Sequence, residues 1–246
     1  MLRKILIIAA IFIFILGGLL YLSTKRGNDN KDGIKKETKA GQPIVSWQNI
    51  TITEEKKSLS ISITAPRVIM YDNYNLGSKI NQTITDYLES MKSEFILGVS
   101  TAAYDNGETS TLNINTKVLL ITPRLISLSF TVAEHLAGIK KDDNPQQTFL
   151  VFDLMKSGRV MEENELFRGD VAWSQAVRKM KALLLSKYEG NPSCDLLFAP
   201  QYNGFAASCI GVDESRGGEH VAIKGDIPTS LVQEFLAPSI LSDAMQ

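Results

Sequence analysis

Two rhythms of hydrophobic and polar positions alternate along the chain. Leu59, Ile61 and Ile63 alternate with serine and threonine, which predicts a half-buried strand that Pro66 ends. Residues 75–97 instead place apolar side chains at three- and four-residue steps, which predicts an amphipathic helix. Its apolar positions are Leu76, Ile80, Ile84, Tyr87, Leu88, Met91 and Phe95.

The next apolar stretches read as paired strands. Residues 111–121 and 125–133 flank Thr122-Pro123-Arg124, which predicts an antiparallel hairpin. A further strand is expected over Gln147–Leu154, closed by the turn Lys156-Ser157-Gly158-Arg159.

The C-terminal third again contains both helical and strand patterns. We expect Asp170 to cap a helix over residues 171–188. Short strands are expected around Asp195–Ala199, Phe205–Ser208 and His220–Ile223, and a final short helix from Thr229 or Ser230. The order predicts an α+β fold, a mostly antiparallel sheet with two main helices packed on it.

Residues 5–22 form an uncharged apolar run, ILIIAAIFIFILGGLLYL. In a helix this run spans roughly 27 Å, close to the ~30 Å hydrocarbon thickness of a bilayer. The run is longer than the core of a signal peptide, about 7–15 residues, and it ends in bulky residues where a peptidase needs small ones. We therefore expect a single-pass N-terminal transmembrane helix, with a cleaved signal peptide as the alternative.

The basic residues around the apolar run and the size of the body give opposite predictions for the side of the membrane on which the body lies. Two basic residues precede the apolar run and six follow it, so the positive-inside rule taken literally places the body in the cytoplasm. Large domains are often translocated regardless of charge, and three acidic residues dilute the cluster. We expect an extracytoplasmic body in spite of the charge count.

These observations divide the chain into three parts. Residues 1–22 are the anchor, and residues 23–46 are polar and glycine-containing, which is typical of a flexible linker. Residues 47–246 are expected to form the α+β body. Within it we expect a first subdomain at about 57–110 and a second at 111–240.

Charge is unevenly distributed. The chain has 26 Lys and Arg against 27 Asp and Glu, but eight basic residues lie in residues 1–46, so the body carries a net charge of −6. An acidic body without a basic stripe argues against nucleic acid as a partner. It suits a cationic partner, although a mild negative charge also serves solubility alone.

The two cysteines, Cys194 and Cys209, can exist in either of two chemical states. In an oxidising compartment they form a disulfide that closes a 16-residue loop and contributes about 3 kcal/mol. In the cytoplasm they are ordinary thiols. No Cys-x-x-Cys or Cys/His cluster is present, so we expect no thiolate-bound metal and no cofactor.

Few residues offer chemistry. His135 and His220 each follow a glutamate, and neighbours in a strand point to opposite faces, so neither pair alone is an acid–base couple. The two histidines could together hold a metal, or they are surface residues; as surface residues they are candidate partner contacts, together with Tyr202 and Phe205. Tyr202 and Phe205 flank Asn203-Gly204, either as exposed contact residues or as a turn with one core aromatic. We expect no enzymatic activity, since no hydrolase or nucleotide-binding motif occurs.

Several segments resemble a known pair of small domains of unknown function. They are ISITAPRVIMYDNYNLGSKINQTITDYLESMKSEF, then LISLSFTVAEHLAG and QTFLVFDLMKSGRVMEENELF, and finally LLFAPQYNGFAASC and VAIKGDIPTSLVQEFLAP. Over about residues 57–240 the pattern resembles the extracytoplasmic region of RsiV-type anti-sigma factors, which bind lysozyme. It also resembles the non-catalytic N-terminal region of PdaC-type peptidoglycan deacetylases.

The resemblance implies a sensing or binding body without the attached activity. Four residues precede the apolar run and no catalytic domain follows residue 240, so we expect neither the anti-sigma nor the deacetylase role to transfer. The leading hypothesis is a binding or sensing protein of the bacterial envelope, anchored in the cell membrane, that recognises a cell-wall component or a cationic lysozyme-like protein. The alternatives are a metal-assisted cell-wall hydrolase at His135 and His220, and a structural accessory of a membrane complex.

Overall fold

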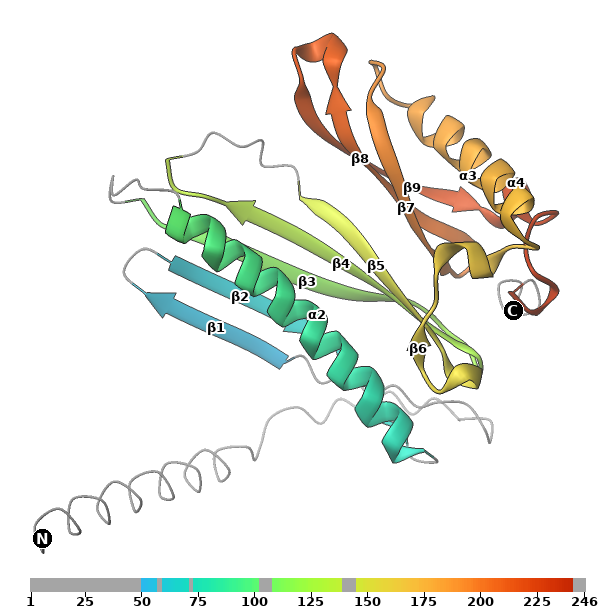
Figure 1. Cartoon of the computed structure of the whole chain (residues 1–246), viewed down its shortest axis with the longest axis horizontal. Helices are drawn as coiled ribbons and strands as arrows, with labels where there is room; N and C mark the ends of the chain where they lie inside the picture. Colours follow the sequence, from blue (N-terminus) through green and yellow to red (C-terminus); the bar gives the residue numbers. More distant parts are fainter. Residues whose placement is uncertain (1–49, 57–58, 71–72, 102–107, 139–144, 241–246) are drawn as a thin grey trace, which may run out of the picture. The chain divides into compact units, whose positions relative to one another are not determined.

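The computed structural model describes residues 50–56, 59–70, 73–101, 108–138 and 145–240 (Figure 1). The predicted transmembrane helix and the linker lie outside the described residues. Among the residues that are described, no helix is both long and apolar enough to cross a membrane.

The described residues form strands, two long helices and several short helical turns. The strands are β1 (Ile50–Lys56), β2 (Leu59–Ala65), β3 (Ser110–Ile121), β4 (Leu125–His135), β5 (Gln146–Asp153), β6 (Arg159–Val160), β7 (Ser193–Gln201), β8 (Gly204–Asp213) and β9 (Glu219–Pro228). The α-helices are α2 (Tyr74–Thr101), α3 (Asp170–Leu185) and α4 (Thr229–Val232), and the 3-10 turns are Leu154–Lys156, Glu163–Leu166 and Glu214–Arg216.

The first sheet has six strands in the order β1-β2-β3-β4-β5-β6. Every neighbouring pair is antiparallel except β2 and β3, which are parallel. A parallel pair needs a crossover connection, and α2 supplies it. The prediction of a mostly antiparallel α+β fold with two main helices is confirmed. The boundary expected at residues 110 and 111 coincides with the start of β3, inside this sheet, rather than with a break between sheets.

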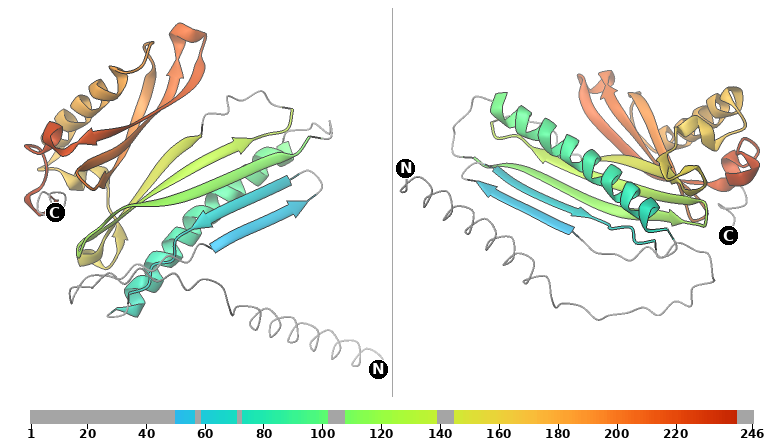
Figure 2. Two further views of the ribbon diagram at one scale, coloured as in Figure 1. Left: turned by 180° about the vertical axis from the view of Figure 1, so that it is seen from behind. Right: turned by 60° about the horizontal axis from the view of Figure 1, so that its bottom comes forward.

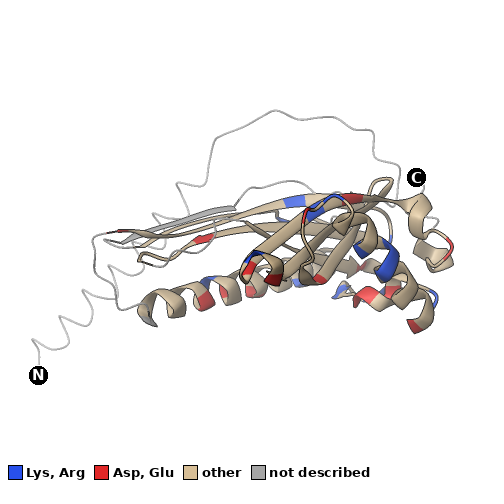
Figure 3. Cartoon of the chain, turned by 90° about the horizontal axis from the view of Figure 1, so that it is seen from above, with Lys and Arg blue, Asp and Glu red and all other residues tan. Residues whose placement is uncertain are grey.

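Helix α2 covers one face of the six-stranded sheet (Figures 1, 2 and 3). Its apolar stripe packs on the alternate positions of β2, β3, β4 and β5, as the two rhythms predict. The fully buried members include Ile61, Ile63, Ile80, Leu112, Ile114, Phe130 and Phe152. Asn73 caps the helix by accepting a hydrogen bond from the backbone N–H of Leu76 at 3.1 Å.

The second sheet, β7-β8-β9, is antiparallel and carries α3. The helix begins at Asp170, but Gly169 is its N-cap residue and no side chain caps it, which corrects the expectation that Asp170 is the cap. It ends at Leu185 rather than at 188. The chain tightens there into i→i+3 turns, in which the N–H of Tyr188 donates to the carbonyl of Leu185 at 3.0 Å.

The three strands of this sheet are longer than the sequence predicts. The predicted segments cover the middle of β7 and the N-terminal halves of β8 and β9, and the backbone pairing continues beyond them. In the antiparallel pairing of β7 with β8, Gly211 lies opposite Cys194. A Cβ at Gly211 would collide with the carbonyl oxygen of Ser193 and the Cα of Cys194, so only glycine fits this position.

One hydrophobic cluster joins the two sheets. It contains Leu119, Leu125 and Val151 from the first sheet, together with Phe198 and Phe205 from the second. Helix α3 contributes Ala176, Met180 and Leu184 to the same cluster. The six-stranded sheet is therefore packed on both faces, by α2 on one side and by part of the second sheet on the other.

Candidate functional site

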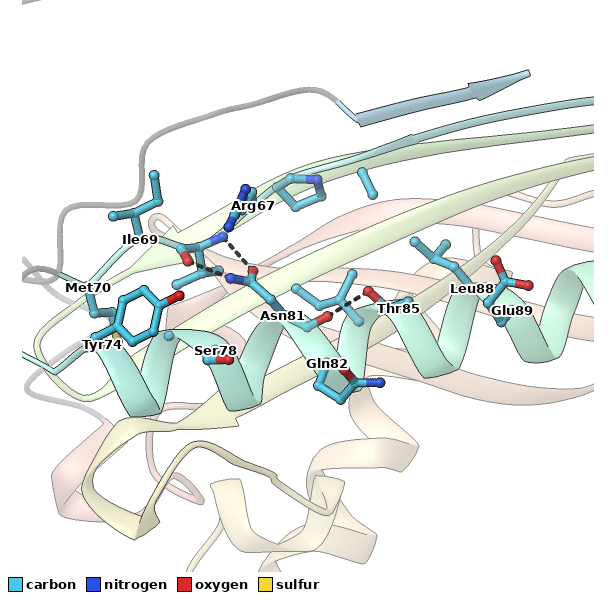
Figure 4. Close-up of a pocket in the computed structure, with 15 residues that line it drawn as sticks. Arg67, Ile69, Met70, Tyr74, Ser78, Asn81, Gln82, Thr85, Leu88 and Glu89 are labelled. Carbon is cyan, nitrogen blue, oxygen red and sulfur yellow. Dashed lines mark hydrogen bonds between the residues drawn. The ribbon is translucent and has the colours of Figure 1, made fainter. Parts of the chain in front are cut away.

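A cavity of about 300 Å³ lies between the N-terminal half of α2 and the segment Pro66–Met70 that follows β2 (Figure 4). We call it the α2 cavity. Ligand pockets in proteins usually hold about 300–1,000 Å³, so this cavity is large enough for a small ligand or for part of an extended chain.

The α2 cavity has an apolar floor and a polar rim. Its floor is made by side chains buried in the core between α2 and the six-stranded sheet, namely Ala65, Val68, Ile84 and Leu88. The rim is formed by exposed polar residues, which are Arg67, Ser78, Gln82, Thr85 and Glu89. Tyr74 lies at one end beside Met70, and 74% of it is exposed (Figure 4). An apolar surface with a few polar groups around it is the usual make-up of a binding pocket.

Asn81 fixes the segment Pro66–Met70 to the helix (Figure 4). Its amide Oδ1 accepts a hydrogen bond from the backbone N–H of Val68 at 2.7 Å, and its Nδ2 donates to the carbonyl of the same residue at 2.7 Å. The approach is close, because a Cβ at Gly77 would lie 3.2 Å from the backbone nitrogen of Met70. The shape of the α2 cavity therefore depends on a single side-chain amide.

The backbone N–H and carbonyl groups of Arg67 and Ile69, the residues on either side of Val68, point away from the amide of Asn81. One planar amide reaches both the N–H and the carbonyl of Val68, so these two groups point to the same side, as in an extended strand. The groups of Arg67 and Ile69 then point to the opposite side, and within the described part of the chain neither forms a backbone hydrogen bond. Among the described residues, the segment thus has the backbone arrangement of a strand edge, to which an extended chain can add.

Asn81→Ala is expected to lower the free energy of unfolding by about 1–3 kcal/mol, because it leaves both backbone groups of Val68 unpaired in a partly buried place. Urea unfolding of the full-length chain in detergent micelles measures this. Gln82→Ala is the matched control on the same helix: its side chain donates only to the exposed Asp86, so the change should stay within about 0.5 kcal/mol. Equal losses in the two variants would contradict the role given to Asn81.

A second cavity, of about 180 Å³, lies between β5, the turn after β6, and β7. We call it the Glu163 cavity. Most of its lining is apolar, including Val151, Leu166 and Phe198. Its polar groups are the carboxylates of Glu163 and of the exposed Glu162, and a hydroxyl pair in which Tyr87 donates to Thr148 at 2.9 Å.

Burial raises the pKa of two groups that line the Glu163 cavity, Glu163 and Tyr87. Loss of water raises the pKa of Glu163, and the hydrogen bond from the backbone N–H of Phe198 to Oε1, at 3.4 Å, only partly opposes this. Loss of water also raises the pKa of Tyr87, against the hydrogen bond with Thr148. A half-buried carboxylate with a raised pKa in a cavity is the kind of group that binding sites use.

Two other buried carboxylates have structural roles. Asp153 accepts from the backbone N–H groups of Met155 and Lys156 and so holds the turn after β5. Asp213 does the same after β8, where the hydrogen bonds of Ser215 lower its pKa. Both side chains satisfy the backbone of a 3-10 turn, as an aspartate at a helix start does.

The structure joins Cys194 and Cys209 in a disulfide, one of the two states that the sequence leaves open. The bridge ties β7 to β8, with the two Cα atoms 5.4 Å apart. Disulfides persist in oxidising compartments and are rare in the cytoplasm.

The predicted contact residues are separated in the fold. Tyr202, at the β7–β8 turn, is 60% exposed and remains available as a contact. Phe205 is fully buried, which corrects the prediction that it contacts a partner. Its ring stacks on Phe167 at 6.4 Å and meets Phe198 edge-on at 6.0 Å.

His135 ends β4 and His220 lies near the start of β9, and both are exposed. Within the described ranges, no three His, Cys, Asp or Glu side chains come together as a group that could hold a metal ion. The metal site that the sequence allowed at the two histidines and their glutamates therefore does not form among these residues.

Asn81 and Glu163 were missed because their local sequence is ordinary. Asn81 is one more polar residue on the helix, and Glu163 lies in an acidic run, Glu162-Glu163-Asn164-Glu165. The only sequence signal for Asn81 is its place one step after the apolar Ile80, on the edge of the buried stripe. Nothing in the sequence separates Glu163 from its two neighbouring glutamates.

Comparison with known proteins gives the fold alone. No family model matches the chain, and neither does any curated protein. A DUF3298 family protein from Pseudomonas aeruginosa matches at 13% identity and a TM-score of 0.50, over 82% of this chain and 98% of its own. A member of the same family from Bacteroides fragilis matches at 17% identity and a TM-score of 0.49, over 83% and 98%. The body thus has the fold of a domain of unknown function.

Proposed function

We propose that this protein is a membrane-anchored binding or sensing module of the bacterial cell envelope, with its α+β body outside the cytoplasm. The observation that carries the proposal is the α2 cavity, which combines an apolar floor, a polar rim and the backbone groups of Arg67 and Ile69, which form no backbone hydrogen bond with the described residues. Such an edge binds an extended chain through main-chain hydrogen bonds, while the adjoining cavity takes alternate side chains.

Two further features support this setting. The disulfide between Cys194 and Cys209 is the form expected in an oxidising compartment. The apolar run of residues 5–22 has the length and composition of a membrane anchor. The resemblance to lysozyme-binding and peptidoglycan-associated domains suggests two ligands, a lysozyme-like cationic protein and a wall peptide. The net charge of −6 on residues 47–246 favours the cationic protein.

A blocked cavity provides the test. Ser78 is exposed on α2 and lines the α2 cavity, so the indole of Ser78→Trp should fill it without disturbing the core. We expect this variant to bind at least about 10-fold more weakly than the wild type, a loss of ~1.4 kcal/mol. The assay titrates the full-length chain in detergent micelles against fluorescent lysozyme and, separately, soluble muropeptides.

Ser93→Trp is the matched control, since Ser93 is exposed on the same helix and does not line the cavity. It should bind like the wild type. Absence of saturable binding by either ligand to the wild type would remove both proposed ligands. Unchanged binding by Ser78→Trp would show that the ligand binds elsewhere on the protein and would contradict the α2 cavity as its site.

A further inference from the structure

The Glu163 cavity holds negative charge without a positive partner. Two glutamates line it, Glu163 within and Glu162 at the exposed rim, and no lysine, arginine or histidine is among its lining residues. The nearest basic residues along the chain are engaged elsewhere: Arg159 and Lys156 pair with Glu165, and Nε of Arg168 donates to the carbonyl of Leu236. In the part of the chain that the structure describes, the carboxylate of Glu163 forms no ion pair and accepts only the 3.4 Å hydrogen bond from Phe198.

We propose that the Glu163 cavity binds the side chain of a lysine presented by a protein partner, with the carboxylate of Glu163 as the counter-ion of the ammonium group. The identity of the partner rests on the proposed function, since a cationic envelope protein is the ligand that the acidic body favours. The site itself follows from the cavity and its charges.

The size of the cavity fits one side chain rather than a whole ligand. At about 180 Å³ it is smaller than the roughly 300–1,000 Å³ of pockets that hold drug-sized molecules. Its walls include Val160, Leu197 and Phe198, which offer an apolar channel. The aliphatic stem of a lysine packs along such walls while its charged end reaches a polar group.

The polar groups suit an ammonium better than a guanidinium. An ammonium has three donors that rotate freely, whereas a guanidinium is a planar fork that is best met by both oxygens of a carboxylate. Oε1 of Glu163 already accepts from the backbone N–H of Phe198, so one carboxylate oxygen is free of backbone contact. The hydroxyl of Tyr87 donates to Thr148, and its oxygen can accept a second hydrogen bond from the ammonium.

The ionised carboxylate of Glu163 also destabilises the folded protein, and a bound cation would remove this destabilisation. Burial raises the pKa of Glu163, which means that the ionised form is disfavoured in the folded protein. Glu163→Gln removes the charge, and its amide oxygen can still accept from the backbone N–H of Phe198. At neutral pH we therefore expect this variant to melt at the same temperature as the wild type or slightly above it, while it loses binding of the cation.

The test uses the full-length chain in zwitterionic detergent and a small probe, Nα-acetyl-lysine N-methylamide, in a titration followed by saturation-transfer NMR. We expect Glu163→Gln to weaken binding of the probe about 10- to 100-fold, the usual worth of a hydrogen bond to a charged group. Glu189→Gln is the control with the same charge change on an exposed loop residue outside the cavity, and it should bind the probe like the wild type.

Two analogues define the chemistry. The norleucine analogue, which has a similar stem and no charge, should bind at least about 10-fold more weakly than the lysine probe. The arginine analogue should also bind more weakly. Equal binding of the norleucine analogue, tighter binding of the arginine analogue, or equal loss in Glu189→Gln would overturn the assignment, as would no binding of the lysine probe.

The probe separates this inference from the proposed function. Saturable, Glu163-dependent binding of the lysine probe supports the site even if neither lysozyme nor muropeptides bind to the protein. Conversely, lysozyme binding that depends on Ser78 and not on Glu163 would support the proposed function and overturn this inference.

Discussion

Phe205→Ala is expected to lower the free energy of unfolding by about 3–5 kcal/mol, the usual cost of removing a buried phenylalanine ring. Phe205 is fully buried, and its ring packs between Phe167 and Phe198 in the cluster that joins the two sheets. Removing the ring therefore leaves a cavity at the point where both sheets meet. Urea denaturation of the full-length chain in detergent micelles, followed by far-ultraviolet circular dichroism, measures the effect.

Tyr202→Ala is the control for this prediction. Tyr202 lies three residues away at the exposed tip of the same hairpin, so its loss should change the stability by less than about 0.5 kcal/mol. If Phe205→Ala were as mild as Tyr202→Ala, Phe205 would be a surface residue, as the sequence alone allowed, and the described core would be wrong.

Replacing both Cys194 and Cys209 with alanine is expected to lower the free energy of unfolding by about 2–4 kcal/mol. The bridge closes a short loop between β7 and β8, and without it the unfolded chain gains conformational freedom. For a body of this size the loss corresponds to a drop in melting temperature of roughly 4–16 °C. Thermal melts of the wild type and the double variant measure it.

Reduction of the wild-type protein gives the internal check. Treatment with a phosphine reductant should lower the melting temperature of the wild type towards that of the double variant, and should leave the double variant unchanged. A wild type that melts at the same temperature with and without reductant would show that the bridge does not stabilise the fold.

Periodicity was sufficient to find the elements whose burial is one-sided. Strand β2 buries alternate residues and α2 buries a stripe, so each pattern is complete within its own segment. The β3–β4 hairpin was found from its two apolar runs and the turn Thr122-Pro123-Arg124 between them, although β4 buries consecutive residues on both of its faces. For these parts the chain carries enough local information to be read without the fold.

Features that depend on distant partners were not readable. The cap of α3 differs from the prediction because Gly169, with a positive φ of 103°, takes the position that Asp170 was expected to hold. Phe205 reads as a loop aromatic until Phe167 and Phe198 are known to surround it. The pairing of Asn81 with Val68 joins residues thirteen positions apart, and local periodicity does not report such a contact.

The candidate sites follow the same division. The sequence indicated the cysteines, since two cysteines allow one pairing, but it did not indicate either cavity. The α2 cavity needs the segment Pro66–Met70 to be held beside the helix, and the Glu163 cavity needs β7 to lie near β5. Binding surfaces of this kind are made by the arrangement of elements rather than by a motif.

The compartment of the body is tested most directly by the state of its two cysteines in cells. The full-length protein is trapped in acid, denatured, and treated with a polyethylene-glycol maleimide with and without prior reduction. An extracytoplasmic body predicts a membrane-associated band that gains mass, by two adducts, only after reduction. A band that gains two adducts without reduction would place the cysteines in a reducing compartment and contradict the envelope role.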